Sequence, residues 1–303
     1  MSSTFANAGF GNGAVAIVAG LVASFLAEKV GFVAPFDASL LLLLGGGFII
    51  QTRWRENYGN SDAVSRASSG WDNFGKAWTL LMTSEKVLLL GVIQSAFESA
   101  MYIFVFMWTP ALESALRAGL LSSGVGGAAP ALPHGVVFAG FMVCTMIGSK
   151  VFELMIQWRP VEHAARWVFV AASAALAVPI LFGSSHNLVL AGFCVFEVCC
   201  GIFWPAAGTM RNKFIQEEVR STVMNVFRVG LNLIVVVVLI NIDYLATDTV
   251  FLLCTLLLTI ATLAQHRLFV LTEQNQSPMD RHRAGLEVGE EMDDVLKSKA
   301  PHD

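Results

Sequence analysis

Charged residues are scarce in this chain. Only 14% of the 303 residues are Asp, Glu, Lys or Arg, whereas soluble proteins average roughly 25%. Hydrophobic residues make up 55% of the sequence, and the mean hydropathy is +0.64. This composition excludes an ordinary soluble domain and indicates a membrane protein.

Signatures of catalysis are also missing. The sequence contains no GxSxG, HExxH or Walker motif and no Cys/His cluster. Its five cysteines lie in or beside hydrophobic blocks without metal-ligand spacing, and we interpret them as small packing residues. We therefore expect no enzyme activity, no metal site, no cofactor and no nucleic-acid partner.

Eight hydrophobic blocks are present instead. Crossing about 30 Å of hydrocarbon takes roughly 20 apolar residues, and the bilayer makes helices the natural form of such segments. The sequence therefore predicts an all-α membrane protein with about eight transmembrane helices. The blocks lie near 9–27, 33–51, 87–111, 134–156, 167–185, 187–210, 221–242 and 249–269.

The basic residues between the blocks are distributed unequally. If every block spans, fifteen Lys and Arg fall on one side of the membrane and only Lys29 and Arg117 on the other. Basic loops near helix ends stay cytoplasmic. This asymmetry predicts that both termini and the loop 52–86 are cytosolic, while the loop 112–133 faces outward.

The loop 52–86 separates two blocks from the other six. Its mixture of charge, Gly and Ser is typical of an interdomain linker. Within it, four apolar residues recur at helical spacing. Such a pattern indicates either an interfacial amphipathic helix under the membrane or a helix packed on the cytosolic face of the bundle. The four residues are Trp71, Phe74, Trp78 and Leu81.

Two carboxylates lie deep inside blocks. A charge at mid-membrane costs about 2.5–3.5 kcal/mol, so it usually faces the bundle interior and has a partner. Glu98 lies about 17 Å into its block, with Gln94 one helical turn before it on the same face. Glu197 lies about 20 Å from the cytosolic end of its block. Both are candidates for a transport pathway, although either can equally pair with a helix end or with Arg228 as a structural lock.

Arg228 is the arginine that lies deepest inside a block. It lies about 10 Å deep, with Asn225 and Asn232 on the same helical face. At that depth its side chain can also snorkel to the interface, but the two asparagines favour an interior or hydrated surface. We therefore include Arg228, Asn225 and Asn232 with Gln94, Glu98 and Glu197 in the candidate site.

Two further patterns indicate structure rather than function. Lys150 and Glu153 are three residues apart near a helix end, where a local ion pair forms easily. Glycines in the first two blocks are typical of positions where helices approach closely. They are Gly9, Gly11, Gly13, Gly45, Gly46 and Gly47.

Several stretches resemble one family. LLLGVIQSAFESAMYIFVFMWTPALE (88–113), FEVCCGIFWPAAGTMRNKFI (196–215) and VMNVFRVGLN (223–232) resemble the eukaryotic molybdate-anion transporters, a branch of the major facilitator superfamily. FANAGFGNGAVAIVAG and WRENYG resemble that family's fifth span and the start of its central loop. The resemblance covers nearly all of residues 4–270. The matching motifs contain Glu98 in IQxxFES, Glu197 in ExxxG and Arg228 in NxFRV.

The resemblance implies a major-facilitator-type bundle, in which two six-helix halves surround a midplane cavity. This chain is then expected to begin at the fifth helix, and a sequence fragment, an incomplete gene model or a short splice form would each account for that. The implied domains are the last two helices of the amino-terminal half, the central cytosolic linker, a complete carboxyl-terminal half and a disordered tail. They cover residues 1–51, 52–86, 87–270 and 271–303.

The implied function is secondary transport of molybdate, or a related oxyanion, into the cell across the plasma membrane. Molybdate is a tetrahedral dianion, to which Arg228 can offer a planar fork of charged hydrogen bonds, with Asn225, Asn232 and Gln94 as neutral contacts. The two carboxylates would hold Arg228 in the empty state or take up a coupling proton. The alternatives are a carrier of another small solute and a truncated membrane protein that does not transport.

Overall fold

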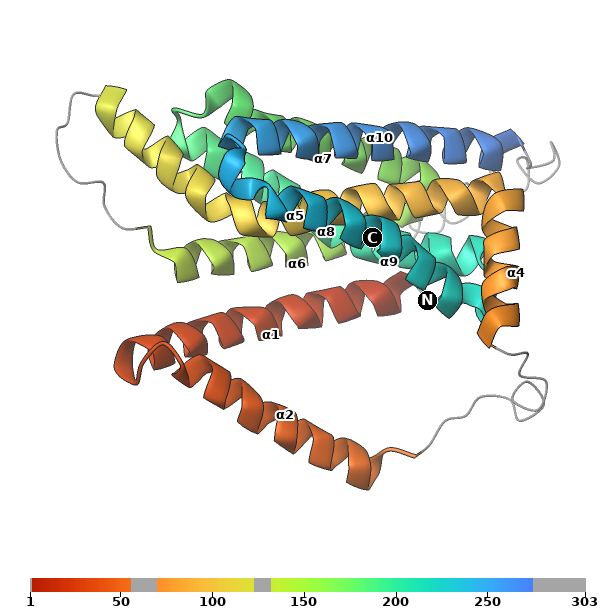
Figure 1. The fold of residues 1–303 in the computed structure, drawn as a ribbon, viewed down its shortest axis with the longest axis horizontal. Coiled ribbons are helices and arrows are strands. Elements are labelled where there is room, and N and C mark those ends of the chain that lie inside the picture. Colours follow the sequence, from red (N-terminus) through yellow and green to blue (C-terminus); the bar gives the residue numbers. More distant parts are fainter. Residues whose placement is uncertain (1, 56–69, 123–131, 275–303) are drawn as a thin grey trace, which may run out of the picture.

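The structure is a computed structural model that describes residues 2–55, 70–122 and 132–274 (Figure 1). These residues form helices joined by short connections, and none of them is in a strand, which confirms the predicted all-α fold. The helices are α1 (Ser2–Lys29), α2 (Ala34–Arg53), α4 (Gly70–Thr83), α5 (Glu85–Ser122), α6 (His134–Trp158), α7 (Val161–Phe182), α8 (His186–Phe214), α9 (Glu217–Ile240), the short 3₁₀ helix η1 (Ile242–Tyr244) and α10 (Thr247–Gln274).

Eight of these helices are long and apolar enough to cross a membrane, as the hydrophobic blocks predicted. Several boundaries differ from the prediction, and two of these differences change the expected loops. α5 continues to Ser122, because residues 111–122 are mostly Ala, Leu, Glu and Arg, which favour helix. The expected outward loop 112–133 therefore begins as helix. α10 continues to Gln274, and the remainder of the expected disordered tail lies outside the described residues.

Six of the spanning helices pack into one bundle. α10 lies against α5 and α7, α8 lies against α6 and α7, and α9 packs on α5. α1 lies along α6 and also contacts α8, whereas α2 packs mainly on α1 and buries none of its residues (Figure 1). The helices α5 to α10 therefore form the core, and α1 and α2 lie at its side.

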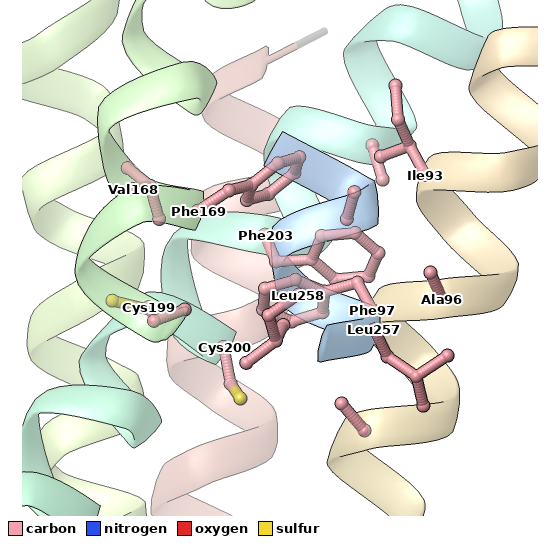
Figure 2. Close-up of a cluster of buried hydrophobic side chains, with 14 of the residues drawn as sticks. Ile93, Ala96, Phe97, Val168, Phe169, Cys199, Cys200, Phe203, Leu257 and Leu258 are labelled. Carbon is pink, nitrogen blue, oxygen red and sulfur yellow. The ribbon is translucent and has the colours of Figure 1, made fainter. Parts of the chain in front are cut away.

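Stacked phenylalanines fill the centre of this bundle (Figure 2). Phe97 of α5 stacks on Phe203 of α8 with ring centroids 4.0 Å apart, and Phe169 of α7 lies 5.2 Å from Phe97. Leu257 and Leu258 of α10 lie in the same cluster. Close packing rather than exclusion of water holds helices together in lipid. This contact therefore fixes the turn of α5 that carries the next residue, Glu98.

Glycines bring α6 and α8 into backbone contact. A Cβ added to Gly148 would overlap the carbonyl oxygen of Val198, and one added to Gly201 would overlap the carbonyl oxygen of Thr145. Only glycine allows two helices to approach this closely. The α6–α8 pair is therefore the most tightly specified helix contact that we find in the described chain.

The predicted packing role of the first glycines is confirmed in part. In α1, a Cβ on Gly9 would meet Ser149 Oγ at 2.8 Å, and one on Gly13 would overlap Met146 of α6. Gly11 and the three consecutive glycines of α2 have nothing within 4 Å among the residues that the structure describes. For those four positions the packing role stays a prediction, because their faces of α1 and α2 meet no other helix among the described residues.

Two lysines connect neighbouring helices through an ion pair or a hydrogen bond. Lys150 Nζ lies 3.1 Å from Glu153 Oε2, as the spacing predicted, and also donates to Asn7 Oδ1 of α1 at 3.0 Å. Lys213 Nζ of α8 lies 2.6 Å from Oε1 of the buried Glu162 in α7. These contacts tie α1 to α6 and α7 to α8.

Candidate functional site

Two serine hydroxyls fix α5 against α9. Ser95 Oγ donates to the carbonyl oxygen of Phe227 at 3.0 Å, and Ser99 Oγ donates to that of Leu231 at 3.4 Å. Serine hydroxyls that bond across helices stabilise such contacts in membranes. Because Arg228 directly follows Phe227, these bonds place it beside the turn of α5 that runs from Gln94 to Glu98.

Glu98 and Gln94 are buried on this turn. Their side chains are only 5% and 3% exposed. Gln94 precedes Glu98 by one helical turn, so the two side chains are neighbours on α5. Glu98 Oε1 and Gln94 Oε1 nevertheless have no hydrogen-bond partner in the described part of the chain. A buried carboxylate in this state needs positive charge nearby.

Two arginines lie in the neighbourhood of this carboxylate. Arg211 of α8 and Arg228 of α9 are within electrostatic range of Glu98, but neither forms an ion pair with it among the described residues. Both α8 and α9 pack on α5. Gln94, Glu98, Arg211 and Arg228 therefore form one group at the junction of three helices, which we call the Glu98 cluster.

Sequence reasoning missed Arg211. The hydrophobic block was predicted to end at residue 210, so Arg211 was counted only among the basic residues of the following loop. α8 instead continues to Phe214, which places Arg211 inside its last turn, where the side chain is half-buried. A basic residue that directly follows a hydrophobic block can still belong to the helix. The position of Arg211 immediately after residue 210 could therefore have indicated that it lies within α8.

Glu197 has different neighbours. Its Oε2 accepts a hydrogen bond from Thr145 Oγ1 of α6 at 3.0 Å. The thiols of Cys144 and Cys200 lie near this carboxylate. Glu197 is thus held at the close contact between α6 and α8, while Glu98 and Arg228 meet at the contact of α5 and α9.

Asn225 and Asn232 lie on α9 with Arg228, and all three side chains are exposed. The spacing of three and four residues places them on one side of the helix. The structure therefore brings Gln94, Glu98 and Arg228 together and leaves the two asparagines on the open side of α9 beside them.

The chemistry of the Glu98 cluster favours an anion rather than a metal. No group of three or more His, Cys, Asp or Glu within the described ranges is arranged to hold a metal ion. Two guanidinium groups near one carboxylate leave a positive balance, and guanidinium groups bind oxyanions through paired N–H donors.

These features define a multi-pass integral membrane protein with charged side chains between its spanning helices, which is a transporter architecture. Residues 1–200 match the family described as sugar transporters with 12 transmembrane helices. The chain therefore belongs to this family of the major facilitator superfamily.

Individual relatives are also similar to the chain. It is 31% identical over 288 residues to the molybdate-anion transporter of Xenopus laevis, an alignment covering 90% of this chain and 58% of that protein. The Xenopus tropicalis protein of the same name is 31% identical over 289 residues, with the same coverage. The Takifugu rubripes protein of that name is 28% identical over 260 residues, covering 77% of this chain and 51% of the relative. The chain thus spans 58% of the length of the first two relatives.

Proposed function

We propose that this chain acts in secondary transport of molybdate or a related oxyanion. The observation that carries the proposal is the Glu98 cluster, in which two arginines lie within electrostatic range of a buried carboxylate between spanning helices. The relatives named molybdate-anion transporters support the choice of molybdate. Two arginines near one buried carboxylate suit an oxyanion better than a neutral solute, because guanidinium groups bind oxyanions through paired N–H donors.

Arg228 is the proposed anion contact. Its side chain is exposed on α9, so it reaches a bound anion more easily than the half-buried Arg211. Its planar guanidinium group can donate paired hydrogen bonds to two oxygens of a tetrahedral dianion. Asn225 and Asn232 on the same side of α9 would donate neutral hydrogen bonds to the remaining oxygens, and the Gln94 amide would contribute from α5.

The carboxylates have a different role, because an ionised carboxylate repels a dianion. Glu98 would balance the charge of Arg228 and Arg211 while the site is empty and lose that interaction when the anion binds. A proton taken up by Glu98 at this step would couple transport to the proton gradient. Glu197, which is held by Thr145, is the second candidate for such a coupling proton.

The proposed architecture divides the chain between two halves. Residues 1–51 would be the end of the amino-terminal half, 52–86 the central linker and 87–270 the carboxyl-terminal half. The packing of α1 on α6 and α8 supports this division, since contact between the halves is needed for one to rock against the other. We place both termini in the cytosol, on the distribution of basic residues. We place the protein in the plasma membrane because the proposed uptake brings the anion into the cell.

This orientation predicts which positions are reached from outside. A cysteine replacing Ser122, at the outer end of α5, should react with an impermeant maleimide on intact cells. A cysteine replacing Arg55, just after α2, should react only after the cells are permeabilised. Both positions are exposed, and the unchanged protein serves as the control for native cysteines. Labelling of the Arg55 position on intact cells would contradict the proposed topology.

Competition for uptake tests the substrate. In cells that lack molybdate uptake, the full gene product containing residues 1–303 should restore saturable molybdenum accumulation, measured by mass spectrometry. Excess tungstate should compete strongly, because it is a tetrahedral dianion of nearly the same size, and a sugar should not compete. The family description favours sugar as a second candidate substrate. Competition by sugar but not by tungstate would contradict the oxyanion assignment.

A further inference from the structure

The helix α4 carries an apolar surface wider than its contact with the rest of the protein. Ala77 and Leu81 are buried, and α4 packs on α9 and α5. Next to this buried stripe, Phe74, Trp78 and Met82 follow one another at intervals of four residues and are 45%, 48% and 59% exposed. The rings of Phe74 and Trp78 stack, with centroids 6.4 Å apart. A second apolar stripe therefore remains without a protein partner in the described chain.

Polar residues occupy the rest of α4. At 100° per residue, Lys76, Thr79 and Thr83 lie on the side away from both apolar stripes, and all three are exposed. The helix thus has three sides: one buried on α9 and α5, one exposed and aromatic, and one exposed and polar. A helix standing wholly in water would gain nothing from the exposed aromatic side.

The position of α4 relates its aromatic side to the bilayer. Figure 1 shows α4 lying across the end of the bundle where α5 begins, whereas the spanning helices run away from it. Only Ser84 separates α4 from α5. Leu81 lines one apolar groove of about 320 Å³ together with Leu88 and Val92 of α5, which are themselves exposed on this spanning helix. The buried stripe of α4 therefore adjoins an exposed apolar surface of α5, a helix long and apolar enough to span the membrane.

We infer that α4 is a membrane-surface anchor whose Phe74, Trp78 and Met82 insert into the boundary between lipid headgroups and acyl chains. Aromatic residues prefer this boundary, and interfacial helices bury their apolar side about 5–10 Å into it. Lys76 then lies on the water side, near anionic headgroups. The sequence left two interpretations of this helix open. In our proposal the buried stripe packs on the bundle, and the exposed aromatic stripe lies under the membrane.

The anchor has a mechanical consequence. α4 is fixed to α9 and α5 by Ala77 and Leu81, and these two spanning helices carry Arg228 and Glu98. Attachment of α4 to the membrane surface therefore holds the ends of both site helices at a fixed depth. This inference does not depend on which solute the protein moves.

Depth measurements on α4 test the inference. A ketone-bearing amino acid is placed singly at Phe74, Trp78 or Met82, or at the matched control positions Lys76 and Thr79, and coupled to a spin label, so that the native cysteines stay in place. The protein is reconstituted in nanodiscs of phosphatidylcholine and phosphatidylserine. Each variant is used only if it elutes as a single species.

The accessibility of each label to oxygen and to a water-soluble nickel chelate then locates it. We expect labels at Phe74, Trp78 and Met82 to be reached by oxygen and shielded from nickel, and labels at Lys76 and Thr79 to show the reverse, so that the oxygen-to-nickel ratio alternates with the helical period. Free access of nickel to the Phe74 and Trp78 positions would place α4 in water and overturn the anchor. Shielding of those positions from both reagents would show that a protein surface covers them and would overturn it equally.

Discussion

Replacing Arg228 with Gln should abolish molybdate uptake by the full gene product that contains this chain. Arg228 is the exposed member of the Glu98 cluster, and its loss removes the fork that meets the dianion. A hydrogen bond to a charged group contributes about 1.5–3 kcal/mol, which corresponds to a loss of affinity of roughly 10-fold to 150-fold. Initial uptake rates at low molybdate, divided by the amount of protein at the cell surface, measure the effect.

One variant distinguishes the paired N–H donors of Arg228 from its charge, and a second variant serves as a control. Arg228→Lys keeps the charge but loses the paired donors, so uptake should fall to an intermediate level. Arg53→Gln removes an exposed arginine from the last turn of α2, far along the chain from the cluster, and should leave uptake unchanged. Wild-type uptake kinetics in Arg228→Gln at normal expression would remove Arg228 from the site.

Replacing Gly148 with Ala should severely destabilise the bundle. The added methyl group would overlap the carbonyl oxygen of Val198, and a backbone atom cannot rotate away as a side chain can. Overpacking usually costs about 1–3 kcal/mol, and here α6 and α8 must separate, so we expect a cost at or above the top of that range. The fraction of protein that stays monodisperse after heating, followed by fluorescence-detected size exclusion, measures the loss.

The same helix contains a matched control. Gly140 of α6 has nothing within 4 Å of its added Cβ, so Gly140→Ala meets no obstacle. Alanine is favoured over glycine in a helix by about 0.8–1 kcal/mol, so this variant should be equally stable or slightly more stable. Equal thermal stability of Gly148→Ala and Gly140→Ala would show that α6 and α8 are not in backbone contact.

Hydropathy was sufficient to predict the spanning helices. Each spanning helix overlaps one predicted block, because lipid leaves a long apolar segment almost no other fold. The helix ends were less predictable. α5 and α8 continue past their apolar segments through residues that favour helix, and Arg211 was missed for that reason.

Depth along a helix also predicted two members of the Glu98 cluster. Glu98 and Arg228 were selected because charge is expensive inside a membrane, and the structure places them within electrostatic reach of each other. The partner of Glu197 could not be predicted in this way. Its bond to Thr145 depends on which faces of α6 and α8 meet, and that is decided by the close approach at Gly148 and Gly201.

Measuring the direct binding of molybdate tests the proposed oxyanion site most closely. The full gene product containing residues 1–303 is purified, and equilibrium dialysis against molybdate is read out as bound molybdenum by mass spectrometry. We expect saturable binding that tungstate displaces, that Arg228→Gln loses, that Arg211→Gln weakens and that Arg53→Gln retains. Saturable binding of equal affinity in the wild type and in Arg228→Gln would contradict an oxyanion site at the junction of α5, α8 and α9.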